Sequence, residues 1–199
     1  MLEAFKAVKR NRGAAGVDKV SIAMFEQQLE QNLNALMRDL KTRGQFRPAP
    51  LRRVHIPKGP RSKETRPLGI PVVRDRVAQE VLRRLLAPIF EPLFHEDSYG
   101  FRPRRNCHMA VGRALKLHGE GLLHVLDADI KGFFDNIPHE VIMRLVAAKV
   151  ADGNILGILQ RFLKAGVMEE GVFKPTPPWR GTPQGGVISP LLANIVLNQ

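Results

Sequence analysis

The chain has 199 residues, and its 31 Lys and Arg against 19 Asp and Glu give a formal net charge of +12 at pH 7. Such an excess of positive charge indicates a polyanionic partner. The sequence contains no run of about 18 apolar residues, which excludes a membrane span and favours nucleic acid over an anionic membrane. Cys107 is the single cysteine, which excludes an intrachain disulfide and fits a reducing compartment such as the bacterial cytoplasm.

The first half of the chain combines helical segments with a basic β-like segment. Apolar spacing predicts helices over residues 1–12 and 21–43, the second capped by Ser21. Proline-punctuated segments over 46–57 and 65–70, joined by a basic turn, predict a β-hairpin. A further helix is predicted over 74–86, and we expect it to end before the next proline.

The middle of the chain carries a basic loop and an apolar run. The loop, residues 99–105, precedes a helix predicted over 106–117, and Cys107 at its start is interpreted as a small buried side chain. Residues 122–130 form an apolar run of strand length. Because apolar residues occur at both odd and even positions of the run, they would face both sides of a strand. We therefore predict a strand buried on both faces.

The last third returns to helix. We predict helices over 138–150 and 154–165, a hairpin over 167–173, and a final helix with Ser189 as its N-cap. Near residues 95–120 the sequence changes from a basic helix-and-hairpin pattern to an α/β pattern, which predicts a division into two modules.

Two carboxylates in the apolar run are candidate metal ligands. Asp127 and Asp129 are two residues apart, so a strand would project both from one face, about 6–7 Å apart. A carboxylate in such surroundings needs a cation or hydrogen bonds, and Mg²⁺ prefers oxygen ligands. The alternative is that a strand-end aspartate caps the next turn. After Gly132, Phe133 and Phe134 could shape a pocket for a sugar or base, or could simply pack in the core.

The positive charge is concentrated between Arg38 and Arg84, where 14 basic residues stand against 4 acidic ones. Lys58 and Arg66 flank the hairpin turn, where they could close on a triphosphate or bind phosphates without specificity. A solvated basic face is the plain alternative for the whole region.

The loop at 99–105 carries Arg102, Arg104 and Arg105, which we interpret as contacts for template or primer phosphates. Its aromatic residues, Tyr99 and Phe101, could stack on bases or belong to the core. The six histidines are scattered without metal-ligand spacing, and none is taken as a ligand.

Five stretches of the chain share one order with a known set of motifs: Gly13–Asp18, Arg66–Pro71, Ser98–Asn106, Asp127–Asp135 and Gly181–Asn194. Together they resemble the reverse transcriptases encoded by group II introns. The first resembles their N-terminal extension, and the next two resemble fingers motifs. The fourth resembles the palm motif in which an Asp precedes an aromatic by five residues, and the last resembles the next palm motif, with its Pro-Gln-Gly core.

This resemblance implies an α/β (α+β) fold of the right-hand polymerase type. Residues 1–118 would form the N-terminal extension and the fingers, with a basic β-hairpin and helices, and residues 119–199 would form a partial palm. The implied activity is RNA-directed DNA synthesis with an intron RNA-binding (maturase) role. The implied partners are template RNA, intron RNA, a DNA or RNA primer, a deoxynucleoside triphosphate and two Mg²⁺ ions.

The resemblance also assigns roles to single residues. Asp129 would bind the catalytic Mg²⁺ ions, with the Ile130 carbonyl as a second ligand, and Phe134 would act as a steric gate against a ribose 2′-hydroxyl. Gln184 would contact the incoming nucleotide, whose triphosphate Lys58 and Arg66 would hold.

One family motif is missing from the sequence. The aromatic-Ala-Asp-Asp turn that supplies further metal carboxylates does not occur before Gln199. We therefore expect the 199-residue chain to be a fragment that does not polymerise by itself, and to self-associate through apolar surface at Val187–Leu197. The main alternative is a non-catalytic module that anchors intron RNA. An RNA-directed RNA polymerase is a third hypothesis, against which the bulky Phe134 argues.

Overall fold

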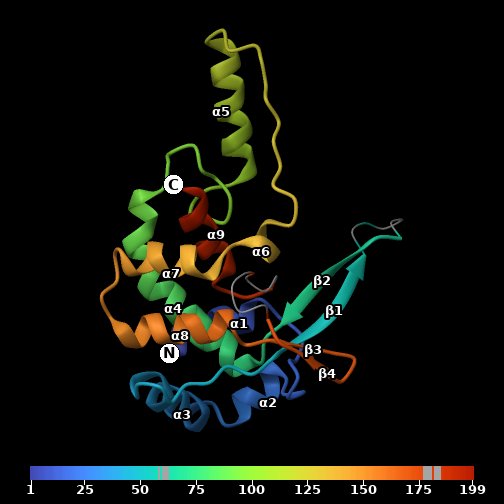
Figure 1. Ribbon diagram of the computed structural model, residues 1–199, viewed down its shortest axis with the longest axis vertical. Helices are drawn as coiled ribbons and strands as arrows, with labels where there is room; N and C mark the ends of the chain where they lie inside the picture. The colour runs from blue at the N-terminus through green and yellow to red at the C-terminus, as the bar shows by residue number, and fades with distance from the viewer. Residues whose placement is uncertain (58, 60–62, 177–180, 182–184) are drawn as a thin grey trace.

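The computed structural model describes residues 1–57, 59, 63–176, 181 and 185–199, so the predicted contacts Lys58 and Gln184 lie outside the described residues. The fold is mixed α+β, as predicted (Figure 1). Its helices are α1 (Leu2–Arg10), α2 (Ile22–Gln27), α3 (Leu29–Lys41), α4 (Val73–Phe90), the short 3-10 helix η1 (Glu91–Leu93), α5 (Cys107–Gly119), α6 (Phe133–Asn136), α7 (His139–Ala147), α8 (Gly153–Leu163) and α9 (Ser189–Leu197). Its strands are β1 (Leu51–Pro57), β2 (Thr65–Ile70), β3 (Val167–Glu169) and β4 (Val172–Lys174).

Helix α4 is the centre of the core. Its apolar residues Val73, Val77 and Leu86 are fully buried, and the helix packs against α1, α2, α3 and α9. One continuous hydrophobic cluster runs from Ala4 to Ile195, so it contains residues from both sides of position 118. The predicted division at residue 118 therefore does not coincide with a break in the core. No helix of the described segments is long and apolar enough to cross a membrane.

Two predicted helices differ in their bounds. The segment predicted as one helix over 21–43 is interrupted at Gln28, which has φ −122° and ψ 41°. Ser21 caps the first part as predicted, because its Oγ accepts a hydrogen bond from the Met24 amide at 3.1 Å. Helix α4 does not end before Pro88 but runs through it to Phe90, because Leu86 and Phe90 lie one turn apart on its buried face.

The sheet joins distant parts of the chain in the order β2-β1-β3-β4. The two predicted hairpins are confirmed: β1 pairs antiparallel with β2, and β3 with β4. Strand β1 also pairs in parallel with β3, with Leu51 opposite Val167. The sheet therefore fixes the basic hairpin to the segment that follows α8.

The strand predicted over 122–130 does not form. The segment has no ladder partner in the described part of the chain, and its side chains are exposed, with Val125 at 88% and Leu126 at 93% of full accessibility. An apolar run needs a neighbouring strand and a covering layer before it can form a buried strand. Figure 1 shows the reason: α5 projects from the rest of the molecule, and the chain returns from its far end to α6 without a sheet beside it.

Three smaller expectations are also wrong. Cys107 is exposed, because α5 has no buried residue. Ser189 is the first residue of α9, and Ile188 occupies the N-cap position instead. The segment Val187–Leu197 does not offer a continuous apolar surface, because most of α9 is buried against α4 and α7.

Candidate nucleotide and RNA site

The segment that contains the Pro-Gln-Gly core is held on its N-terminal side by the backbone near α6 and by a buried histidine. The Gly181 amide donates to the Ile137 carbonyl at 2.9 Å, and the His139 Nε2 donates to the Gly181 carbonyl at 2.7 Å. Gly181 has φ +96°, and a Cβ there would stand 3.2 Å from the Asp135 carbonyl oxygen. Glycine is therefore required by the backbone conformation and by the close contact with α6.

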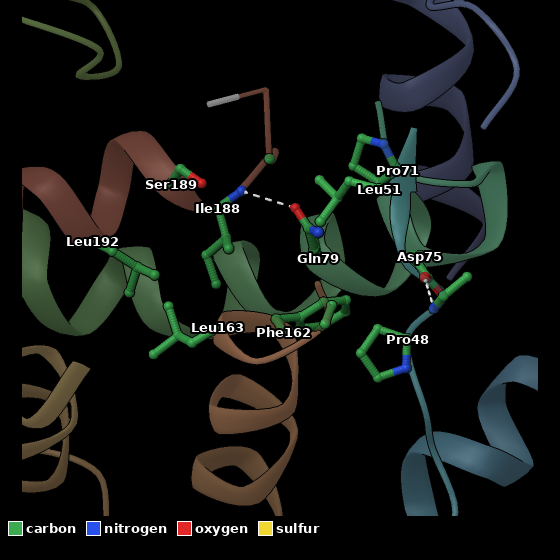
Figure 2. Close-up of a pocket in the computed structure, with 13 residues that line it drawn as sticks. Pro48, Leu51, Pro71, Asp75, Gln79, Phe162, Leu163, Ile188, Ser189 and Leu192 are labelled. Carbon is green, nitrogen blue, oxygen red and sulfur yellow. Dashed lines mark hydrogen bonds between the residues drawn. The ribbon is translucent and has the colours of Figure 1, made fainter. Parts of the chain in front are cut away.

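Its C-terminal side is held by a glutamine from helix α4. The Gln79 Oε1 accepts hydrogen bonds from the Val187 amide at 2.7 Å and from the Ile188 amide at 3.4 Å. Figure 2 shows the Gln79 side chain directed at the Ile188 backbone, just before α9. Gly185 has φ +107°, and a Cβ there would overlap the Gly69 carbonyl of β2. Residues 185–188 are therefore held both by the central helix and by the basic hairpin.

The junction beneath these contacts is closely packed. The cavity between α4, α8 and α9 is about 20 Å³, room for about one water and far too small for a nucleotide. Asp75, one turn before Gln79, is buried at the side of this cavity (Figure 2). Its carboxylate accepts from the Ala49 amide at 2.7 Å, yet burial raises the pKa of Asp75 to about 6. The junction serves as a rigid support and any nucleotide must bind outside it.

Phe134 belongs to α6, the helix whose Asp135 carbonyl lies against Gly181. Gly132, with φ +62° and ψ 33°, turns the chain into α6, where the Phe133 and Phe134 rings meet edge to face with centroids 5.9 Å apart. Both rings are half-buried and pack against the core. The following residue, Asp135, contacts the Gly181 position through its carbonyl. The fold therefore brings the candidate gate and one end of the Pro-Gln-Gly segment together.

The candidate metal ligands are exposed and form no metal centre among the described residues. Asp129 and Ile130 are both exposed, at the end of the return segment that leads from α5 to Gly132. In the described part of the chain, no group of three or more His, Cys, Asp or Glu side chains is arranged to hold a metal ion. Asp129 and the Ile130 carbonyl are two oxygen donors, fewer than the six that Mg²⁺ prefers. These residues do not by themselves form a metal centre.

Arg66 is exposed on β2, where it pairs with Ile56 of β1 in the register of the hairpin. The hairpin extends away from the helical part of the molecule (Figure 1). Arg66 is therefore accessible to a phosphate group.

The three arginines of the 99–105 loop have different surroundings. The Arg102 Nε donates to Glu91 at 2.7 Å, and its other nitrogens donate to backbone carbonyls, including that of His95 at 2.7 Å. Arg102 therefore holds the loop together, and a direct phosphate contact would require it to give up these bonds. Arg105 lies over the Tyr99 ring at 5.2 Å, and Arg104 is exposed. Arg104 is the arginine of this loop best placed to meet RNA.

Comparison with known proteins decides the family. Residues 56–199 match the family model described as reverse transcriptase (RNA-dependent DNA polymerase). The chain belongs to this reverse transcriptase family.

Individual relatives of this reverse transcriptase chain narrow the group. It is 42% identical to the group II intron-encoded protein LtrA of Lactococcus lactis subsp. cremoris over 170 aligned residues. The aligned residues are 85% of this chain and 28% of LtrA. This chain is 39% identical over 206 residues to protein YkfC of Escherichia coli K12, covering all of this chain and 52% of that protein. The chain is also 35% identical over 94 aligned residues to nuclear intron maturase 1, mitochondrial, of Arabidopsis thaliana. Those residues cover 47% of this chain and 13% of that protein. These matches confirm the predicted membership in the group II intron reverse transcriptases and maturases, and the chain spans about half or less of each relative's length.

Sequence reasoning missed the two side chains that hold the Pro-Gln-Gly segment. His139 is one of six histidines without metal-ligand spacing, and its spacing alone does not mark it as an anchor. Gln79 did carry a signal: Asp75 and Gln79 are polar residues one helical turn apart in a stripe that otherwise contains valine and leucine. A buried polar pair of this kind needs hydrogen-bond partners, which here come from other elements.

Proposed function

We propose that this chain provides the fingers and the first part of the palm of an RNA-directed DNA polymerase of the group II intron-encoded type. The reaction is attack of a primer 3′-hydroxyl on the α-phosphate of a deoxynucleoside triphosphate, with release of pyrophosphate. The observation that carries the proposal is the contact between α6, which bears Phe134, and Gly181 at the start of the Pro-Gln-Gly segment. By resemblance to the reverse transcriptase family, the helix that bears Phe134 and the Pro-Gln-Gly segment are expected to lie on either side of the nucleotide, and this contact brings the two together.

The residues of the chain then divide the work of binding and orientation. Phe134 limits the space beside the sugar and so selects deoxyribose, while Gln184 contacts the nucleotide. Lys58 and Arg66 neutralise the triphosphate from the hairpin. Gln79 and His139 hold the two ends of the Pro-Gln-Gly segment by the bonds described above.

A divalent metal ion would supply charge neutralisation at the reacting phosphate. We propose Asp129 and the Ile130 carbonyl as two of its ligands. Because the described residues form no complete metal centre, no step of the reaction is assigned to the ion.

The test is primer extension on an RNA template by the complete gene product that contains these 199 residues, with the 199-residue chain assayed beside it. We expect template-dependent extension by the gene product. In the gene product, Phe134→Ala should raise ribonucleotide incorporation relative to deoxynucleotide incorporation by at least about tenfold, because the gating ring is removed.

Phe133→Ala is the matched control, because it removes the neighbouring ring of the same helix. Unchanged sugar selectivity in Phe134→Ala, or an equal change in Phe133→Ala, would refute the gate. A gene product that binds RNA but never extends a primer would refute the polymerase proposal and favour the alternative, a module that only anchors intron RNA.

The alternative is favoured by one observation of its own, the exposure of Arg104 in the 99–105 loop. If this loop binds RNA, Arg104→Gln with Arg105→Gln should flatten the dependence of RNA affinity on salt. An unchanged salt dependence would remove the loop from the RNA site.

A further inference from the structure

A second basic feature lies away from the 99–105 loop and from the Pro-Gln-Gly segment. A surface groove of about 470 Å³ separates the linker after α3 from the C-terminal end of α8. We call it the Arg161 groove, and the residues that line it include Gly44, Arg47, Pro48, Gln160, Arg161 and Lys164. None of the described residues that line it is acidic.

The groove is built on a fixed frame. The Asn154 Nδ2 at the start of α8 donates to the Leu40 carbonyl at 2.7 Å, which ties α8 to the end of α3. Beneath them the rings of Phe46 and Phe162 pack with centroids 5.3 Å apart. The linker is also held from α4, because Arg74 donates to the Arg47 carbonyl at 3.3 Å. The groove therefore exists before any ligand binds.

Three cations line this groove without a counter-ion: Arg47, Arg161 and Lys164. Within the described ranges, none of the three forms an ion pair with Asp or Glu within 4.0 Å.

Three arginines of helix α4 are neutralised, in contrast. Arg74 pairs with Asp39 at 2.7 Å, and Arg83 and Arg84 pair with Glu80 at 2.7 and 2.8 Å. The groove thus gathers three unpaired cations in one hollow, where like charges raise the local potential and attract an anion.

Helix electrostatics explain only part of this arrangement. Arg161 and Lys164 stand at the C-terminal end of α8, where a cation is stabilised by the helix dipole. That effect gives no reason for Arg47, which comes from another segment and lines the same hollow.

We propose that the Arg161 groove binds the phosphate backbone of an RNA strand, as a contact separate from the 99–105 loop. The inference rests on RNA as the partner in the proposed function. Phe46 and Phe162 are buried, at 0% and 5% of full accessibility, so the groove offers no aromatic face for base stacking. The contact is therefore to phosphates and independent of base sequence. A lipid surface fits less well, because the hollow is concave and no large apolar side chain stands at its rim.

The test measures the affinity of the 199-residue chain for a labelled 20-nucleotide single-stranded RNA of mixed sequence at several KCl concentrations. The variant carries Arg47→Gln, Arg161→Gln and Lys164→Gln, which remove three charges and keep side-chain length. Each neutralised phosphate contributes about 0.7 to the slope of log affinity against log salt for a single strand. We expect the slope to become shallower by about 2, and the affinity to fall at least about tenfold at low salt.

The matched control carries Arg10→Gln, Lys19→Gln and Arg144→Gln, three exposed cations on separate parts of the chain. It has the same net charge as the groove variant, and we expect its slope to stay within about half a unit of the wild type. An equal loss in both variants, or no loss in the groove variant, would overturn the proposal. If the wild-type chain binds no RNA at all, the RNA partner of the proposed function fails together with the groove.

A second measurement covers the case in which the triple variant folds poorly. Hydrogen exchange of residues 153–165 in the wild-type chain should slow when the RNA is added, and residues 22–27 of α2 should be unaffected. Protection confined to the 99–105 loop would leave the proposed function standing and refute the groove.

Discussion

Replacing Gln79 with methionine would remove one side-chain oxygen from the centre of the molecule and leave two backbone amides without their acceptor. Gln79 is buried at 6% of full accessibility, and its Oε1 accepts from Val187 at 2.7 Å and from Ile188 at 3.4 Å. Methionine is close to glutamine in length and volume, so the substitution tests the hydrogen bonds with little change in packing.

The expected cost follows from the two distances. A buried donor that loses its acceptor costs about 1–3 kcal/mol, and the longer Ile188 bond contributes less than the Val187 bond. We therefore expect the segment at 185–188 to open more easily by about 2 kcal/mol, which is roughly a 30-fold change in its local equilibrium.

Amide hydrogen exchange followed by NMR measures that equilibrium directly. The Val187 and Ile188 amides should exchange roughly 30-fold faster in Gln79→Met. Gln27→Met, at an exposed position of α2, should leave both amides at their wild-type rates. Wild-type exchange of the Val187 and Ile188 amides in Gln79→Met would show that Gln79 does not anchor the segment.

Three further predictions concern the same junction. Because burial raises the pKa of Asp75 from 3.8 to about 6, the folded chain keeps a proton that the unfolded chain releases. This contribution to stability is complete below about pH 4 and is lost as the pH rises to about 6, by up to about 3 kcal/mol. Urea denaturation should show a flatter pH dependence for Asp75→Asn, and an unchanged one would contradict the assignment. His139→Ala should lower the free energy of unfolding by about 1–3 kcal/mol through loss of its bond to Gly181, and a change below about 0.5 kcal/mol in urea denaturation would count against that anchor. Gly185→Ala should lower the melting temperature, because the new Cβ meets backbone at positive φ, whereas Gly112→Ala in α5 has open space and should not.

The sequence was sufficient for elements whose signal is local. The helices around Leu36, Val77 and Ile158 follow from apolar spacing, and the two hairpins follow from turn residues between β-like runs. The strand over 122–130 was predicted wrongly because its apolar pattern says nothing about whether a neighbouring strand is present. The helix end at Pro88 was wrong because burial of Phe90 outweighs the local preference of proline.

Of the candidate site, too, the sequence could predict only the features that have a local signal. The motif containing Phe134 and the segment after Gly181 could be found from spacing and resemblance. The anchors could not, because the Gln79 bond joins residues 108 positions apart and the His139 bond joins residues 42 positions apart. Only the fold brings such groups together, and no local pattern marks the pairing.

The exposed return segment over 122–130 has a thermodynamic consequence. Fixing the backbone of these nine residues in one conformation costs on the order of 10 kcal/mol of conformational entropy. Burying the five large apolar side chains of the segment, Leu122, Leu123, Val125, Leu126 and Ile130, would return about the same amount. The segment that carries Asp129 is thus near balance between order and disorder, and its state depends on what surface covers it, while α4 and the anchored junction keep their shape regardless.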